Sequence, residues 1–139
     1  MNHWLGPYGD LIYSVMRLVI GFQFWCHGAG KVFGMFGGRT RDLASLTGVA
    51  GLIEVVGGAL IAVGLLTTYS AFICSGEMAF AYFLSHAPRG GWPIENGGEG
   101  PVLFCFIFLF IAAHGSGKWS LDTMLWGTKP LRTPSADSA

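Results

Sequence analysis

Long apolar runs, separated by short polar segments, dominate this sequence of 139 residues. The hydrocarbon core of a bilayer is about 30 Å thick, and a helix needs roughly 20 apolar residues to cross it. Four runs approach that length, at residues 11–33, 46–66, 69–86 and 102–114. Charged residues make up only 12% of the chain, so most of its surface is expected to face lipid rather than water. The sequence therefore predicts an all-α integral membrane protein, a four-helix bundle with up-and-down topology.

The apolar runs also define the expected organisation of the chain. They predict an N-terminal segment at residues 1–10, a four-helix transmembrane domain at residues 11–122, and a polar tail, expected to be disordered, at residues 123–139. The second and third runs meet at Thr67-Thr68 just after Gly64, which predicts a tight hairpin. Residues 87–100 are rich in Gly and Pro and predict a long loop. Lys and Arg divide almost equally between the two sides, so the positive-inside rule leaves the orientation open.

Composition and cysteine spacing exclude several function classes. The counts of Lys and Arg and of Asp and Glu are equal, at 8 each, and no basic stripe of the kind that binds nucleic acid is present. Each of the 3 cysteines lies in a different apolar run and no CxxC pair occurs, so neither a metal site nor a disulfide framework is expected. Gly57-Gly58 predicts close helix packing. The aromatic series Phe104, Phe106, Phe108 and Phe110 predicts lipid contact, with a platform for a quinone ring as the alternative.

Ionisable residues inside the apolar runs are the most informative ones. Burying one in a membrane costs at least about 3 kcal/mol, so each should turn into the bundle and find a partner. In an up-and-down bundle, the rise of 1.5 Å per residue lets depths be compared between helices. His27 and Lys31 lie four residues apart on one helix face, and His27 should reach a depth similar to that of Glu54. We therefore predict that Glu54 pairs with His27 or Lys31.

Further polar residues from the third and fourth runs reach the same side of the bundle. The residues predicted to converge on one pocket there are His27, Lys31, Glu54, His86, Asn96 and Glu99. On the opposite side, Arg17 with Glu77 is the natural structural ion pair. The alternatives are that Arg17 and Lys31 extend to the lipid headgroups, that the histidines form hydrogen bonds at the interface, and that the glutamates serve only as structural pairs.

The polar and glycine positions between Tyr13 and Asp122 occur in a specific order. They are Arg17, Gly21, Phe24, His27-Gly28, Lys31, Phe33-Gly34, Glu54, Gly57-Gly58, Gly64-Leu65, Thr67, His86, Asn96-Gly97-Gly98-Glu99, Gly115-Ser116-Gly117 and Ser120-Leu121-Asp122. In this order the sequence resembles the DoxX family of small bacterial integral membrane proteins. The resemblance implies four membrane helices. It also implies a link to thiosulfate:quinone oxidoreductase, to quinone and thiol stress, and to membrane-associated redox complexes.

The leading hypothesis is a multi-pass protein of the bacterial inner membrane that acts as a subunit of a redox system. In this hypothesis a quinone-type or other small molecule binds near the end of the first helix. The predicted ligand-binding residues are His27, Lys31, His86 and Asn96, and the predicted catalytic, proton-exchanging residues are Glu54 and Glu99.

The sequence has no haem or flavin motif, so any electron-carrying cofactor is expected to be a mobile quinone or to belong to a partner. If the protein is an enzyme, it is expected to be an oxidoreductase component that acts with quinone and with a soluble or membrane redox partner. The alternatives are a non-catalytic scaffold that anchors a soluble oxidoreductase and a small-molecule carrier. A homo-oligomer in the bilayer is compatible with each of them.

Overall fold

The structure is a computed structural model that describes residues 4–127, and every regular element in that part of the chain is a helix. The α-helices are α1 (Gly9–Phe33), α2 (Leu46–Val63), α3 (Thr67–Ala81), α4 (Pro93–Asn96), α5 (Glu99–His114) and α6 (Leu121–Trp126). Short 3-10 segments lie at η1 (Gly6–Tyr8) and η3 (Ala87–Arg89), and a π-helical segment, η2, at Tyr82–His86. The all-α prediction is confirmed.

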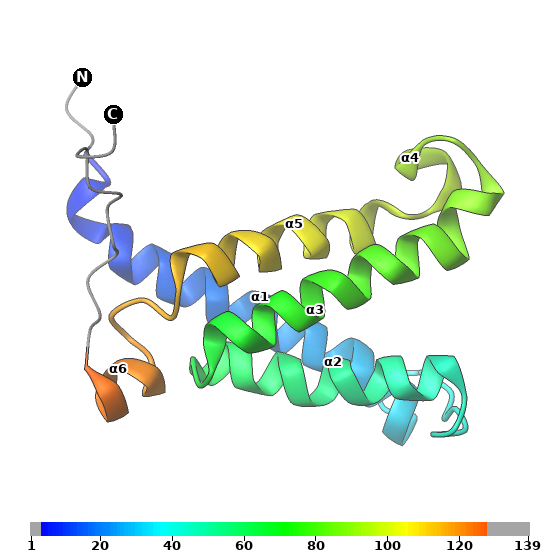
Figure 1. Ribbon diagram of the computed structural model, residues 1–139, viewed down its shortest axis with the longest axis horizontal. Helices are drawn as coiled ribbons and strands as arrows, with labels where there is room; N and C mark the ends of the chain where they lie inside the picture. The colour runs from blue at the N-terminus through cyan, green and yellow to red at the C-terminus, as the bar shows by residue number, and fades with distance from the viewer. Residues whose placement is uncertain (1–3, 128–139) are drawn as a thin grey trace, which may run out of the picture.

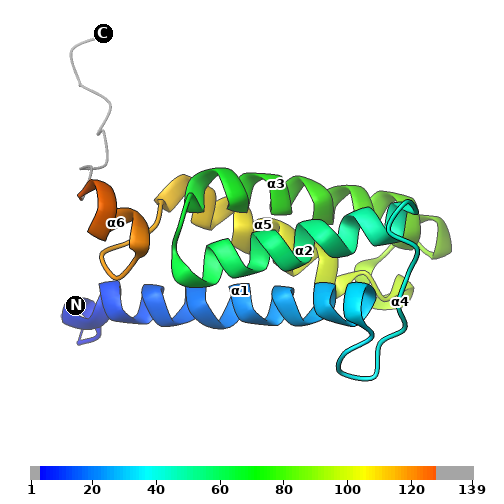
Figure 2. The same cartoon turned by 90° about the horizontal axis from the view of Figure 1, so that it is seen from below.

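The long helices α1, α2, α3 and α5 lie along one another, and consecutive ones run in opposite directions (Figure 1). Figure 2 shows α4 and the α1–α2 connection together at one end, which we call the loop end. The start of α1 and the short helix α6 lie at the other end, which we call the terminal end. Contacts are concentrated between α1 and α2 and between α3 and α5, with α2 and α3 joining the two pairs.

Glycines bring the backbones of α1 and α2 into direct contact. A Cβ atom on Gly21 would lie 2.5 Å from the backbone nitrogen of Ala62, and one on Gly28 would lie 2.6 Å from the backbone nitrogen of Val55. Both distances are shorter than a side chain tolerates. On α2, Gly58 is packed equally tightly against α1, with only 2.5 Å from an added Cβ to the Trp25 nitrogen. The prediction that Gly57-Gly58 permits close helix packing is confirmed.

The predicted hairpin between the second and third runs is also confirmed. Helix α2 ends at Gly64, whose left-handed φ of 74° closes the helix, and Leu66 continues the turn with a φ of 49°. The first amides of α3 have no partners within their own helix. The Asp122 carboxylate provides partners for these amides: its Oδ1 accepts a hydrogen bond from Leu66 N at 2.7 Å, and its Oδ2 accepts one from Thr67 N at 2.9 Å. The aspartate at the start of α6 therefore fixes the terminal end.

The structure corrects several expected boundaries. The tail predicted to begin at residue 123 is wrong for its first residues, because Ser120 caps α6 and the helix continues to Trp126. The rest of that predicted tail, from residue 128 onward, lies outside the described residues. The predicted loop at 87–100 contains η3 and α4, and α5 already begins at Glu99. The third run is helical to its predicted end, but its last residues form the π-helical η2.

The core corrects one part of the aromatic prediction. Phe108 was expected to contact lipid, yet it is fully buried and packs edge-on against Phe24 with ring centroids 4.7 Å apart. Phe106 and Phe110 are exposed, as predicted. Phe104 and Phe108 lie four positions apart, so both are on one helix face, and both contact Phe24 of α1. Aromatic contacts thus join α1 to α5.

Candidate functional site

A buried ion pair joins α1 to α2 near the loop end. Lys31 Nζ lies 2.6 Å from Glu54 Oε1, which confirms the predicted pairing of Glu54 with Lys31. The Glu54 side chain is only 2% exposed and that of Lys31 is 33% exposed. The second carboxylate oxygen, Oε2, is buried without a hydrogen-bond partner among the described residues. The close approach at Gly51, where a Cβ would meet Lys31 Cβ at 2.9 Å, lets the lysine reach across.

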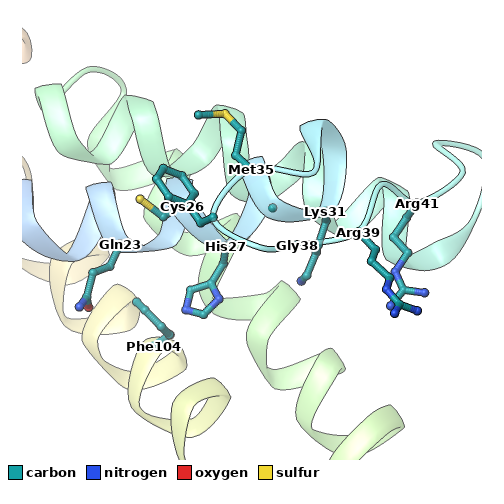
Figure 3. Close-up of a pocket in the computed structure, with 11 residues that line it drawn as sticks. Gln23, Cys26, His27, Lys31, Met35, Gly38, Arg39, Arg41 and Phe104 are labelled. Carbon is teal, nitrogen blue, oxygen red and sulfur yellow. The ribbon is translucent and has the colours of Figure 1, made fainter.

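A cavity of about 530 Å³ lies beside the last turns of α1 (Figure 3). It is lined by Gln23, Cys26, His27, Gly30, Lys31, Met35, Phe36, Gly38, Arg39, Arg41 and Phe104. Of the six residues predicted to converge on one pocket, His27 and Lys31 line this cavity. The imidazole of His27 meets the ring of Phe104, from α5, edge to face at a centroid distance of 5.9 Å.

Two lining residues, Arg39 and Arg41, were not recognised as site residues from the sequence, where they counted only as loop charges. The chain after α1 turns back on the helix through Gly34 and Gly37, whose φ angles are 69° and 77°. Arg41 N then donates to the carbonyl oxygen of Lys31 at 2.8 Å. This return fixes both arginines at the mouth of the cavity. The sequence signal that could have indicated this return is the glycine-rich stretch at residues 34–38 directly after the helix, followed at once by Arg39 and Arg41.

Glu54 is paired with Lys31 but does not itself line this cavity. Two other residues predicted to reach the pocket, His86 and Asn96, form a separate cluster in the α3–α5 connection. His86 Nδ1 lies 3.2 Å from the carbonyl oxygen of Asn96. Asn96 Nδ2 donates to Gly90 O at 2.9 Å, and Asn96 Oδ1 accepts from Gly98 N at 2.8 Å. The amide is buried and its groups hold the connection together, so the loop folds on itself instead of reaching the cavity. Glu99 is exposed at the first residue of α5 and lines no part of this cavity.

The predicted ion pair of Arg17 with Glu77 is wrong. Arg17, which is 2% exposed, donates through Nη1 to the carbonyl oxygens of Ile61 and Ala62 and through Nη2 to Trp119 O at 2.7 Å. The last carbonyls of a helix have no partners within it and carry the negative end of its dipole. The guanidinium therefore binds the carboxyl end of α2 instead of a carboxylate.

Glu77, the residue predicted to pair with Arg17, shares a cavity with Lys31 instead. This second cavity, of about 400 Å³, is mainly apolar and lies between α2 and α3. The Oε2 atom of Glu77 is buried without a partner among the described residues. Lys31 thus lines both cavities, with the buried Glu54 on α2 and the partly buried Glu77 on α3.

Comparison with known proteins identifies the family. The family model named DoxX matches residues 12–87, which covers α1, α2, α3 and η2. The chain belongs to the DoxX family. This confirms the family recognised from the sequence and, because the family is membrane-associated, the prediction of a membrane protein. Arg17, Lys31, Glu54 and Glu77 all lie inside the DoxX match.

Two relatives of this DoxX chain come from Haemophilus influenzae, and each is described only as an uncharacterized protein. One is 38% identical over 129 residues, covering 88% of this chain and 96% of the relative. The other is 30% identical over 74 residues, covering 53% of this chain and 49% of the relative. No solved structure matches the chain.

Proposed function

We propose that the four long helices cross the membrane as an up-and-down bundle, which makes the chain a multi-pass protein of the bacterial inner membrane. Among the described helices, α2 is both long and apolar enough to cross a bilayer, and α5 is apolar but shorter, at 16 residues. Helix α1 has 25 residues and is about 37 Å long at the usual rise. Helix α3 continues through η2 from Thr67 to His86.

The distribution of side chains supports this placement. Large apolar side chains such as Leu18, Phe72 and Phe106 are exposed on the long helices, whereas the charged groups of Arg17 and Glu54 are buried. That is the reverse of a water-soluble bundle and is what a lipid environment requires. Exposed tryptophans lie near both ends of the bundle, where the membrane interface favours them: Trp4, Trp119 and Trp126 at the terminal end and Trp92 at the loop end.

Within this bundle we propose that the cavity beside α1 binds the headgroup of a quinone or of a similar small molecule. The observation that carries the proposal is the Lys31–Glu54 pair, which lies beside this cavity and leaves one carboxylate oxygen buried and unpartnered. Lys31 and His27 are the groups that would donate hydrogen bonds to a headgroup oxygen. Phe104 offers an aromatic wall. The residues present therefore fit such a ligand.

The chemistry divides between the ligand, the chain and a partner. A bound quinone would supply the capacity to take up electrons and protons together. The role of Glu54 is to hold or pass a proton at Oε2, while Lys31 balances its negative charge. Glu54 is bonded to Lys31, a residue that lines the cavity, so we assign proton exchange to Glu54 and not to the exposed Glu99. Electrons would come from a soluble or membrane redox partner, which affinity copurification in mild detergent should recover.

Ligand binding to the purified protein tests this proposal. We expect a short-chain ubiquinone or menaquinone analogue to bind the wild type, and about tenfold or weaker binding to Glu54→Gln and to Lys31→Met, since each removes one charged hydrogen-bonding group. Lys118→Met, at the terminal end, is the control and should bind like the wild type. Unchanged binding in both Glu54→Gln and Lys31→Met would eliminate the site.

A further inference from the structure

The mouth of the cavity carries two arginines that the quinone proposal does not use. Arg39 and Arg41 extend in the same direction and line the same cavity (Figure 3). The side chain of Thr40, which lies between them in the sequence, packs near Gly34 instead: its Cγ2 would be 3.3 Å from a Cβ atom added to Gly34. Among the described residues the ion pairs are Lys31–Glu54 and Lys118–Asp10. Neither arginine is therefore neutralised by an acidic side chain within residues 4–127.

The charge of the cavity is one-sided. Its lining contains His27, Lys31, Arg39 and Arg41 but no acidic residue. The positive charge of Lys31 is balanced by Glu54, so the guanidinium groups of Arg39 and Arg41 supply the uncompensated positive charge. The one aspartate close by in sequence, Asp42, uses its Oδ1 to accept from Ala44 N at 3.0 Å within the loop. Two like charges that face one space repel each other, and an anion placed between them removes that repulsion.

The arginines are held in place by the backbone on which they stand. Arg41 N is bonded to Lys31 O at 2.8 Å, and Gly38 N donates to Met35 O at 2.9 Å. Gly38 lies directly on α1, where an added Cβ would be 2.7 Å from Gly30 Cα. Two planar guanidinium groups carried on this fixed backbone can match the oxygens of a tetrahedral oxyanion, since each can donate two parallel hydrogen bonds.

We propose that the cavity mouth is a subsite for an anionic phosphate-type group, bound by Arg39 and Arg41. This subsite shares the cavity of the proposed quinone site but uses different side chains, those of the loop and not the Lys31–Glu54 pair. At the surface of a membrane bundle the phosphate can be the headgroup of an anionic phospholipid, whose chains would lie on the apolar lining formed by Cys26, Met35 and Phe36. The same chemistry also accepts a free phosphate ion.

The test uses the full chain in a nonionic detergent, with phosphatidylglycerol, phosphatidylcholine and inorganic phosphate as separate probes. We expect phosphatidylglycerol to raise the Tm of the wild type and phosphatidylcholine to leave it unchanged. In Arg39→Gln/Arg41→Gln the affinity for phosphatidylglycerol should fall about tenfold or more, since two charged hydrogen-bonding groups are removed. Both arginines are exposed, so this variant should fold normally.

Arg89→Gln is the matched control, because Arg89 is an exposed arginine at the same end that does not line the cavity. It should bind phosphatidylglycerol like the wild type. Stabilisation by phosphatidylglycerol alone identifies a lipid headgroup, and stabilisation by inorganic phosphate as well identifies a free oxyanion. No binding of either, or an equal loss in Arg89→Gln, overturns the proposal.

The two proposed sites can fail separately. Arg39→Gln/Arg41→Gln should keep wild-type binding of the quinone analogue, and Glu54→Gln should keep wild-type binding of phosphatidylglycerol. Loss of phosphatidylglycerol binding in Glu54→Gln, in a variant that retains its Tm, would show that the anion depends on the buried pair and would overturn the assignment to the arginines. Absence of quinone binding in the wild type would overturn only the proposed function.

Discussion

The two partners of the Lys31–Glu54 pair should differ in how much their removal destabilises the protein. Glu54 is 2% exposed, so Lys31→Met leaves a buried carboxylate without its cation. Removing one partner of a buried pair typically costs about 3 kcal/mol or more of unfolding free energy. In Glu54→Gln the remaining partner is Lys31, whose side chain is already 33% exposed and lines the cavity, so its ammonium group can turn into that space. We therefore expect a loss of about 1–2 kcal/mol there, the value of one charged hydrogen bond.

The double variant Lys31→Met/Glu54→Gln should recover most of the stability lost in Lys31→Met, because it leaves no uncompensated charge. The assay is equilibrium unfolding in mixed micelles, followed by tryptophan fluorescence. Lys118–Asp10 is the matched control: its N···O distance is also 2.6 Å, but its side chains are 66% and 51% exposed. Variants of this surface pair should lie within about 1 kcal/mol of the wild type.

Two outcomes would refute the reasoning about the pair. One is a Lys31→Met variant no less stable than Lys118→Met, and the other is a double variant whose loss equals the sum of the single losses. The same variants separate a functional role from a structural one. A double variant that is stable but no longer binds the quinone analogue supports the proposed function, whereas one that is stable and binds normally leaves the pair with a structural role only.

Two further predictions concern packing and capping. Gly21→Ala should cost about 3 kcal/mol of stability, because its methyl group must displace the α2 backbone. Gly76→Ala has nothing within 4 Å of the added Cβ and should stabilise α3 by about 0.5–1 kcal/mol. Equal effects of the two substitutions on the Tm would contradict the backbone contact at Gly21. Asp122→Ala should cost about 1–2 kcal/mol by freeing the first amides of α3, and an unchanged Tm would show that this cap does not stabilise the hairpin.

The sequence predicted features that depend on distance along the chain. The lengths of the apolar runs, and the helix stop at Gly64, predicted where the long helices lie, because a helix has a fixed rise and glycine tolerates the conformation that ends it. The same rise placed His27 at the depth of Glu54 and put Lys31 on the same helix face one turn away, so a pair of Glu54 with His27 or Lys31 was predictable, but not which of the two would form it. Close packing at Gly57-Gly58 was predictable because only small residues let helix backbones touch.

Features that depend on direction around a helix, or on loop folding, were not predictable in this way. Arg17 and Glu77 were paired by charge, but equal depth does not make two side chains face each other, and the free carbonyls at the end of α2 were not counted as partners. Asn96 was assigned to the pocket, although hydrogen bonds within its own loop occupy it. Arg39 reaches the cavity only through left-handed turns whose course no periodicity reveals.

The glycine contacts between α1 and α2 have a mechanical consequence. Backbones that touch at Gly21 and Gly28 cannot slide past each other without a steric clash, and α3 is tied to α5 by the Ser75 hydroxyl, which donates to Cys105 O at 2.8 Å. The cavity beside α1 is closed on its far side by a residue of that second pair, Phe104. The cavity therefore has walls from both helix pairs, and a small displacement of one pair along the other would widen or narrow it while both pairs stay intact.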